Sequence, residues 1–409
     1  MTADATSTAA RRTLDALLDG VDDLHPRLAG RYPLFRRPDD AWVTSRRGSW
    51  TGGLWAGLLW LRALERPESA RVDAARTASA GLAVWAEADT ATRGLVFWYP
   101  LALSRFVVPG GVAALEEAAG RAARSLGERF AREAGVIPWG DAFGGSGDRV
   151  RVDGAPGVAP LMRAARGVSE SISAAGAAHL VRHLRLCWDG SAVVPVWRLD
   201  GDGVARDEAP TRYWSRGRAW LLAAFADAVR LGLVGPDDPA LGTVLDADAP
   251  LVPPADAEDA QGPVDTGAAA IEAVALLRLA RALESPPAAR PWSWPAHPAA
   301  DDGEGTVRAG GEGAPVADAA HGPAHRTATA SPRGGAPAGD RARRATAARA
   351  RAHAIVRALE RDHVGAHGLG QGSYEVADGL VTGIESVWGN FFLALAAAMV
   401  LGTVPEDLV

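Results

Sequence analysis

The sequence predicts an all-α fold of about ten to twelve helices in antiparallel pairs, and three observations support this class. Apolar residues recur at helical spacing through most of the 409-residue chain. Sustained alternation of apolar and polar residues, which is typical of half-buried strands, is scarce. Breaks rich in glycine and proline separate the apolar segments, as at residues 109–111, 144–147 and 235–239. Because 48% of the residues are apolar, the chain can bury a large core.

Four segments show the helical pattern most clearly, and a fifth is apolar throughout. In chain order, the periodic positions are Leu14, Leu17, Leu18, Val21 and Leu24; Leu54, Leu58, Leu61 and Leu64; Leu221, Phe225, Ala228 and Val229; and Ile271, Val274, Leu277 and Leu279. The longest apolar run, residues 391–401, is shorter than the roughly 20 residues that span a bilayer. We therefore expect a buried helix there and no membrane partner. The short extended segment 192–197 is expected in a loop between helices.

Residues 286–345 are expected to form a disordered insertion in a single domain made of residues 1–285 and 346–409. Proline, glycine, alanine, aspartate and arginine dominate this segment, and aliphatic residues are almost absent. Such a segment cannot bury enough apolar surface to offset the entropy lost on ordering. Its histidines, His297, His321 and His325, are scattered, so we expect no metal site there.

The composition excludes several classes of protein. A net charge of −6 leaves no global basic field, so nucleic acid is not an expected partner. The single cysteine, Cys187, permits neither an intrachain disulfide nor a thiolate zinc cage, and we expect it to be a buried thiol. No His/Asp/Glu cluster has ligand spacing, so no metal or other cofactor is implied. The N-terminal residues lack the apolar core of a signal peptide, which predicts a cytoplasmic protein.

The most informative segment, residues 213–220, places two tryptophans and Arg216 at the head of an apolar helical run. Aromatic surface and a guanidinium group at the start of a helix favour a ring-shaped anionic ligand. The natural candidate is an acidic sugar. A related arrangement opens the first long helical segment, residues 50–60, where glycines clear space beside the indoles.

Six motifs follow one another in an order that resembles the unsaturated uronyl hydrolases, glycoside hydrolase families 88 and 105. They are Trp50-x-x-Gly53-x-Trp55-x-Gly57, Gly135-Val136-Ile137-Pro138-Trp139, Val152-Asp153-Gly154 with Pro160-Leu161, Trp214-Ser215-Arg216-Gly217-x-Ala219-Trp220, Asp265-Thr266-Gly267-Ala268-Ala269 and Glu385-Ser386-Val387-Trp388-Gly389-Asn390-Phe391-Phe392. The resemblance covers residues 40–400 apart from the insertion. Each motif is weak alone, and the ordered set is more specific.

This resemblance implies an (α/α)6 barrel whose funnel binds an acidic oligosaccharide. The ligand carries the C4=C5 unsaturated uronic acid that polysaccharide lyases leave at a non-reducing end. In these families an aspartate protonates the double bond and deprotonates the attacking water, after which the hydrated product rearranges and releases the sugar. The reaction is a vinyl ether hydration, so the two-carboxylate rule for glycosidases does not apply directly.

Asp153 matches the family's acid/base aspartate. Considered alone, Asp153-Gly154 is typical of a turn or a helix cap. A carboxylic acid that donates a proton near neutral pH needs an apolar wall, which the indoles of Trp139 and Trp220 could supply. Arg216 matches the family's substrate arginine, whose fork of donors suits a uronate carboxylate.

Several further positions match residues that contact substrate in the family, and each has a structural alternative. The tryptophans at positions 50, 139 and 220 match pocket-lining aromatics, but tryptophan also fills helical cores. His179 matches a substrate-contacting histidine, although a lone histidine on a helix is more often structural. Ser386 is expected near the pocket rim, and its alternative is a helix N-cap. Arg216 could instead pair with Asp207 or Glu208.

The chain also departs from the family. Where the family usually has a His-Asp pair followed by Gly-Phe, residues 92–98 begin Thr92-Arg93-Gly94, so the second active-site aspartate is missing. The usual Gln-Gly pair before the tryptophan–arginine motif is absent. The common Trp-Gly-Asp is Trp388-Gly389-Asn390. These changes leave the acid/base in place but remove neighbours that would tune it.

Three functions are consistent with the sequence. The first is a glycoside hydrolase that releases an unsaturated uronic acid. The second is a catalytically impaired carbohydrate-binding protein on the same barrel, motivated by Thr92 and Arg93. The third is a sugar isomerase or epimerase, which would need pocket-facing histidines; His179 and His183 lie four residues apart on one helical face. The sequence leaves open the sugar that follows the uronate and the oligomeric state.

Overall fold

The computed structural model describes residues 2–144, 146–201, 203–206, 214–285, 338–366, 368–376 and 379–409. Within these residues the predicted all-α class is confirmed, with two small sheets in addition. The helices are α1 (Thr2–Leu24), α2 (Gly52–Glu65), α3 (Ser69–Gly81), α4 (Tyr99–Val107), α5 (Ala113–Glu128), α6 (Val158–Ala164), α7 (Glu170–Leu186), α8 (Arg216–Arg230), α9 (Pro239–Asp246), α10 (Thr266–Glu284), α11 (Ala338–Asp362) and α12 (Val387–Val400).

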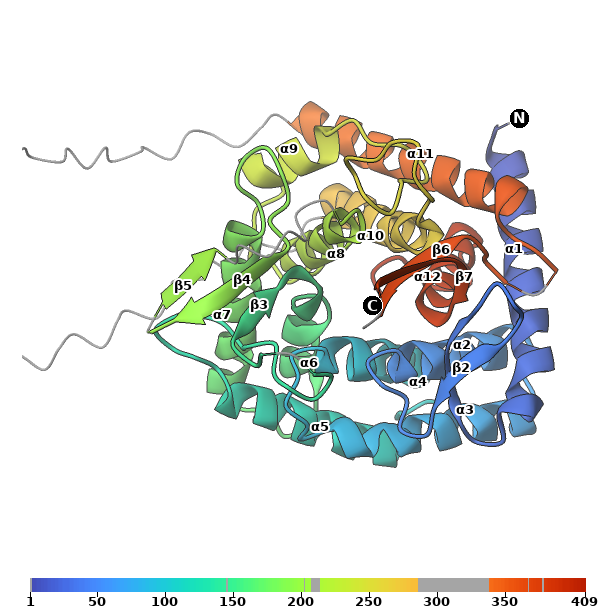
Figure 1. The fold of residues 1–409 in the computed structure, drawn as a ribbon, viewed down its shortest axis with the longest axis horizontal. Helices are drawn as coiled ribbons and strands as arrows, with labels where there is room; N and C mark the ends of the chain where they lie inside the picture. The colour runs from blue at the N-terminus through green and yellow to red at the C-terminus, as the bar shows by residue number, and fades with distance from the viewer. Residues whose placement is uncertain are drawn as a thin grey trace, which may run out of the picture.

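The helices form an inner and an outer layer, with even-numbered helices inside and odd-numbered helices outside (Figure 1). Helix α10 packs against α8, α11 and α12, and α12 packs against α1 and α2. Nearly every residue of α10 is buried, whereas the outer helix α3 buries only Ala75 and Ser79. A helix that is apolar around its whole circumference is stable only inside a protein, and the alanine-rich inner helices satisfy this condition.

The longest apolar run behaves as predicted. Residues Phe391 to Met399 of α12 are all buried. No helix in the described ranges is both long and apolar enough to cross a membrane.

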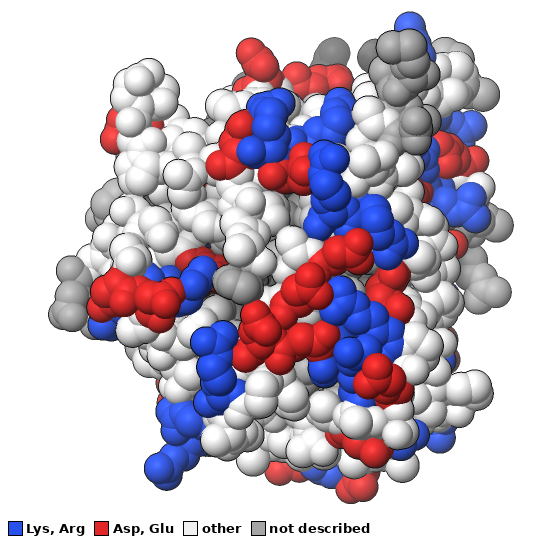
Figure 2. Space-filling view, turned by 90° about the vertical axis from the view of Figure 1, so that its right-hand side faces the viewer, with Lys and Arg blue, Asp and Glu red and all other residues white. Residues whose placement is uncertain are grey.

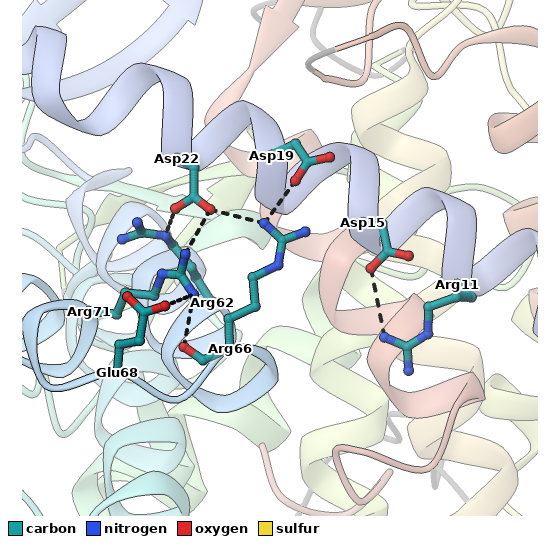
Figure 3. A network of polar contacts seen from close by, with 8 residues as sticks. All are labelled: Arg11, Asp15, Asp19, Asp22, Arg62, Arg66, Glu68 and Arg71. Carbon is teal, nitrogen blue, oxygen red and sulfur yellow. Dashed lines mark hydrogen bonds and ion pairs between the residues drawn. The ribbon is translucent and has the colours of Figure 1, made fainter.

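The outer helix α1 is fixed to α2 and α3 by a network of ion pairs (Figure 3). Asp22 of α1 accepts from Arg66 at 2.9 Å, from Arg71 at 3.4 Å and from Arg62. Asp19 lies 2.8 Å from the same Arg66. On the face of the molecule that includes α1, acidic and basic side chains are interspersed, so that face carries no field of a single sign (Figure 2).

Two small antiparallel sheets connect the helices. The four-stranded sheet has the order β2-β1-β7-β6, and the three-stranded sheet has the order β3-β4-β5. The strands are β1 (Tyr32–Arg36), β2 (Trp42–Ser45), β3 (Arg149–Arg151), β4 (Val196–Asp200), β5 (Gly203–Arg206), β6 (Gly372–Val376) and β7 (Gly379–Ser386). The predicted loop 192–197 therefore ends in β4. Strand β7 runs directly into α12, and β3 runs into a short 3-10 helix, Val152–Gly154.

One boundary of the predicted insertion is wrong. Helix α11 begins at Ala338, so residues 338–345 are helical. Ala345 is buried, and the guanidinium group of Arg344 lies against Gly242 of α9. The signal was the continuation of apolar spacing backwards from the helix at Ala348 and Ala352, both of which are buried. Residues 286–337 lie outside the described part of the chain, so their predicted disorder remains a prediction.

We expect residues 286–337 to be dispensable for folding, because their composition offers no core. Replacing them with a short glycine-serine linker should leave cooperative thermal unfolding intact. A longer deletion, 286–345, is the matched comparison. It removes the buried Ala345 and the Arg344 contact, and should lower the free energy of unfolding by at least about 1 kcal/mol. A broad, non-cooperative transition in the shorter deletion would contradict the prediction.

Candidate active site

A row of aromatic rings and guanidinium groups crosses the end of the molecule where several inner helices begin. The Arg151 guanidinium carbon lies 4.5 Å from the centroid of the Trp139 ring and 5.8 Å from that of Trp214. Arg216, the first residue of α8, lies 5.1 Å from the same Trp214 ring and 5.4 Å from Trp388. Cations within about 6 Å of an indole are attracted by its electron-rich face. The row therefore alternates rings and cations.

The row continues to the start of α2. The Trp50 and Trp388 ring centroids are 5.3 Å apart. Trp50 Nε1 donates a hydrogen bond to the hydroxyl of Tyr374, on β6, at 3.2 Å. Helix α10 begins against the same indole of Trp388, where a Cβ atom at Gly267 would lie 2.6 Å from Nε1. Only glycine fits at that position, which explains the third residue of the Asp-Thr-Gly motif.

Asp153 lies in this row and forms a two-point ion pair with Arg151. The Arg151 Nε donates to Oδ1 at 3.0 Å, and Nη2 donates to Oδ2 at 3.1 Å. The Arg151 side chain is 27% exposed and that of Asp153 is 14% exposed. Burial lowers the pKa of Arg151, but the charge and hydrogen bonds of Asp153 outweigh burial and raise that pKa above its ordinary value.

The helix-cap alternative for Asp153 does not hold. Helix α6 begins at Val158, and its N-cap residue is Gly157. No side-chain cap bond is formed at the start of the short helix Val152–Gly154 either. Asp153 therefore faces Arg151 instead of a helix terminus.

His179, which was predicted to contact substrate, lies behind this turn. The side chain is fully buried, and the Ile137 N–H donates to Nδ1 at 2.9 Å. Because Nδ1 accepts, Nε2 carries the proton and donates to the carbonyl oxygen of Gly154 at 3.2 Å. Burial and the neighbouring His183 lower the pKa of His179 well below its ordinary value. His179 thus holds the main chain beside Asp153, which is the structural alternative.

His183 is also buried, with Nδ1 2.9 Å from the carbonyl oxygen of His179 and the two rings 4.1 Å apart. Burial lowers the pKa of His183 to about 4, although the charge of Asp153 acts in the opposite direction. The two histidine side chains are therefore closed off from solvent. This removes the observation on which an isomerase or epimerase depended.

Two other residues predicted to contact substrate are buried. Trp220 is buried, with its ring 5.6 Å from Phe392 in an edge-to-face arrangement, because it lies one helical turn deeper in α8 than Arg216. Ser386 is buried and accepts the Gly389 N–H at 3.0 Å, which makes it the N-cap of α12. Core packing and helix capping explain these two residues.

Arg216 lies where predicted but has a different partner. Its side chain is 6% exposed, and Nη1 donates to Asp265 Oδ2 at 2.8 Å and to the carbonyl oxygen of Ser373. Asp265 is fully buried and also caps α10 by accepting the Ala268 N–H. The predicted alternative partners, residues 207 and 208, lie outside the described residues.

The position expected to hold a second carboxylate is next to the Asp153 turn. A Cβ atom on Gly154 would lie 3.2 Å from the Cβ of Ala91, the residue before Thr92, so the loop that contains Thr92 contacts the Asp153 turn. The loop presents Thr92, whose hydroxyl is buried and lies 2.8 Å from that of Thr90. Within the described ranges, no group of three or more His, Cys, Asp or Glu residues is arranged to hold a metal ion.

The sequence indicated Arg151 only as a neighbour of Asp153 and Trp388 only as a residue near the pocket rim, and it assigned Asp265 and Trp214 no role in the site. Arg151 stands two residues before Asp153, but adjacency does not show that the side chains bond. Asp265 belongs to the Asp-Thr-Gly motif, and the only role that its position in the sequence suggests is that of a helix N-cap.

Solved structures of unsaturated glucuronyl hydrolases share this fold. The enzyme from Bacillus sp. GL1, named for its part in degrading glycosaminoglycan, matches with a TM-score of 0.69 and 19% identity over 96% of this chain and 95% of its own. The Streptococcus agalactiae enzyme matches with a TM-score of 0.70 and 16% identity over 98% and 93%. An unsaturated glucuronyl hydrolase specific for heparin matches with a TM-score of 0.67 and 16% identity over 96% of each chain. No family model and no curated protein matches the sequence.

The buried His183 should make the protein less stable in mild acid. The unfolded chain binds a proton at His183 near pH 6.5, whereas the folded chain does so only near pH 4. Between these values the unfolded state binds more protons, so the free energy of unfolding falls as the pH falls. From pH 7 to pH 5 the loss from this residue should be about 2 kcal/mol.

Urea unfolding of the parent and of His183→Gln at both pH values measures this contribution. The variant keeps a donor for the His179 carbonyl but cannot titrate, so its loss should be smaller by that amount. Equal losses in the two proteins would show that His183 does not contribute.

Proposed function

We propose that the protein is a glycoside hydrolase that releases an unsaturated uronic acid from lyase-generated oligosaccharides by hydrating the C4=C5 bond. The observation that carries the proposal is the position of Asp153 in the row of indoles and guanidinium groups. This row lies at the end of the molecule where the inner helices α2, α8, α10 and α12 begin, which we call the mouth. The fold shared with unsaturated glucuronyl hydrolases supports it. We further propose that the alternating inner and outer helices form an (α/α)6 barrel, of which this mouth is the open end.

The mouth suits an acidic sugar on physical grounds. The indoles of Trp139, Trp214 and Trp50 offer flat apolar surfaces that pack against sugar rings. Helices α8, α10 and α12 begin here, and the positive ends of their dipoles favour an anion. Glycosaminoglycan and heparin, for which two of the structural neighbours are named, are acidic polysaccharides.

The reaction balances with water as the only co-reactant. Asp153, in its protonated form, gives its proton to C4 of the vinyl ether. The resulting carboxylate takes a proton from water as the water oxygen bonds to C5, which restores the acid. The hydrate at C5 is a hemiketal. When its bond between C5 and the ring oxygen breaks, C5 becomes a ketone and C1 becomes a hemiacetal, which collapses to an aldehyde and releases the next sugar as an alcohol.

Asp153→Asn removes the transferable proton while keeping the shape of the side chain. General acid/base catalysis contributes roughly 10²- to 10⁴-fold, so turnover should fall by at least that factor. Turnover is measured as loss of the ultraviolet absorbance of the C4=C5 bond in unsaturated disaccharides. Any change in affinity for a saturated uronate or in the melting temperature should be much smaller than this loss of turnover.

Asp148→Asn is the matched control, since this exposed residue lies just before β3 and undergoes the same change of charge. It should retain full turnover. An Asp153→Asn protein as active as this control would place the acid/base elsewhere.

Arg216 is proposed to bind the uronate carboxylate with the donors that Asp265 and Ser373 do not use. Arg216→Lys keeps one charged donor for Asp265 but loses the planar fork. Binding of glucuronic acid should weaken by about 1.5–3 kcal/mol, measured by calorimetry. Arg218→Lys, two residues along α8, is the control, because Arg218 pairs with Glu272 at 2.6 Å outside the row. If both variants bind the sugar as tightly as the parent, the assignment of Arg216 is wrong.

A second function, a carbohydrate-binding protein without turnover, is favoured by two observations. Thr92 stands where a second carboxylate is expected, and Asp153 is held as an ion pair. Both functions predict that the mouth binds acidic sugars, so turnover separates them. A flat absorbance trace with several unsaturated disaccharides, together with measurable binding, would establish the second.

A further inference from the structure

The ion pair at Asp153 conflicts with the chemistry proposed for it. Two hydrogen bonds from Arg151 stabilise the ionised carboxylate, whereas an acid that donates a proton must first be protonated. A catalytic Asp153 therefore needs an event that removes Arg151. The structure points to the ligand itself as that event.

We propose that Arg151 is an anion-binding residue that exchanges partners, leaving Asp153 for an oxyanion of the bound sugar. The oxyanion is a carboxylate or a sulfate ester, since both present two oxygens to a guanidinium fork. The inference rests on the proposed function for the class of ligand, and on the contacts of Arg151 for the exchange.

The surroundings of Arg151 allow its partner to change while the side chain stays in place. Its guanidinium carbon lies within 6 Å of the rings of both Trp139 and Trp214, so the cation keeps favourable contacts without a carboxylate. Nε and Nη2 carry the bonds to Asp153. The side chain is also 27% exposed, so an incoming anion can reach it.

The neighbouring ion pair of Arg216 and Asp265 is, by contrast, not able to exchange partners. Asp265 is fully buried and also caps α10, so its loss from Arg216 would leave a buried charge without a cation. Asp153 is more exposed and caps no helix, so water can take the place of Arg151 beside its carboxyl group. Of the two pairs in the row, that of Arg151 is therefore the exchangeable one.

Exchange would give the site selectivity without an additional pocket. A neutral sugar leaves Asp153 ionised and paired, whereas an acidic sugar takes Arg151 and frees the carboxyl group. The charge of Glu375, on β6, also stabilises the charged form of Arg151 and so raises its pKa.

A double-mutant cycle on the full chain tests the exchange by calorimetry, with glucuronic acid, N-acetylglucosamine 6-sulfate and neutral N-acetylglucosamine as probes. Arg151→Gln should weaken binding of at least one acidic probe by about tenfold, the scale of a charged hydrogen bond, and leave the neutral sugar unchanged. The acidic probe that responds identifies the oxyanion. Asp153→Asn should tighten binding of that probe, because Arg151 no longer has to leave a carboxylate.

The double variant Arg151→Gln/Asp153→Asn is decisive. In the absence of Arg151, the Asp153→Asn change should no longer tighten binding, because only Arg151 gains a free guanidinium group when the Asp153 carboxylate is removed. Tightening that persists without Arg151 would mean simple charge repulsion and would overturn the proposal, as would an Arg151→Gln protein that binds every probe like the parent. Arg151→Lys, which keeps the charge, should give intermediate affinity and covers the case in which Arg151→Gln fails to fold.

The cycle is independent of turnover. If the affinities follow the expected pattern but unsaturated disaccharides are not turned over, the hydrolase function is rejected and the partner exchange of Arg151 is supported. Turnover without the cycle would reject only the exchange.

Discussion

A charged pair in the apolar interior joins the inner helices to one another and to the site. Asp227 of α8 lies 2.5 Å from Arg278 of α10, and both side chains are almost completely buried. The second oxygen of Asp227 accepts the N–H of Gly157, the residue that caps α6 just after the Asp153 turn. Removing either partner would leave a buried charge uncompensated, at a cost of about 3–5 kcal/mol. The position of Asp153 therefore depends on how α8 and α10 pack.

Charged and polar groups have different partners in the interior of the protein and at the mouth. In the interior, Asp227 and Arg278 form an ion pair, whereas the fully buried Arg93 donates to main-chain carbonyl oxygens of Thr90 and Ala86. The rest of the interior is mainly alanine, leucine and aromatic rings. At the mouth, the first turns of the inner helices leave main-chain N–H groups without helical partners. Asp265 and Ser386 satisfy some of these groups as caps. Caps are needed at the mouth because each inner helix leaves its first N–H groups unpaired there, just as it leaves its last carbonyl groups unpaired at its other end.

The helices could be predicted from the sequence because apolar spacing reports burial directly, as in α10 and α12. The motifs also indicated which segments meet at the mouth. The roles of single residues were less predictable, because spacing fixes the face of a helix but not its depth, so Trp220 was expected beside Arg216 and lies in the core. The partners of His179 and Arg216 come from distant segments, and only tertiary packing brings those atoms together.

Helix α10 ends far from the mouth, at the point where the described residues stop before α11. Helix α10 begins at the mouth and rises by about 1.5 Å per residue, so its 19 residues carry the chain about 28 Å away before it ends at Glu284. Helix α11 starts after the undescribed residues and returns toward the mouth at Asp362, where the His363 carbonyl bonds Gly370 and the Gly370 carbonyl bonds Thr266. A fluorescent protein or an affinity handle spliced between these helices would thus be anchored at the opposite pole from the ligand. This junction is therefore an attachment point for immobilising the protein with its mouth turned outward.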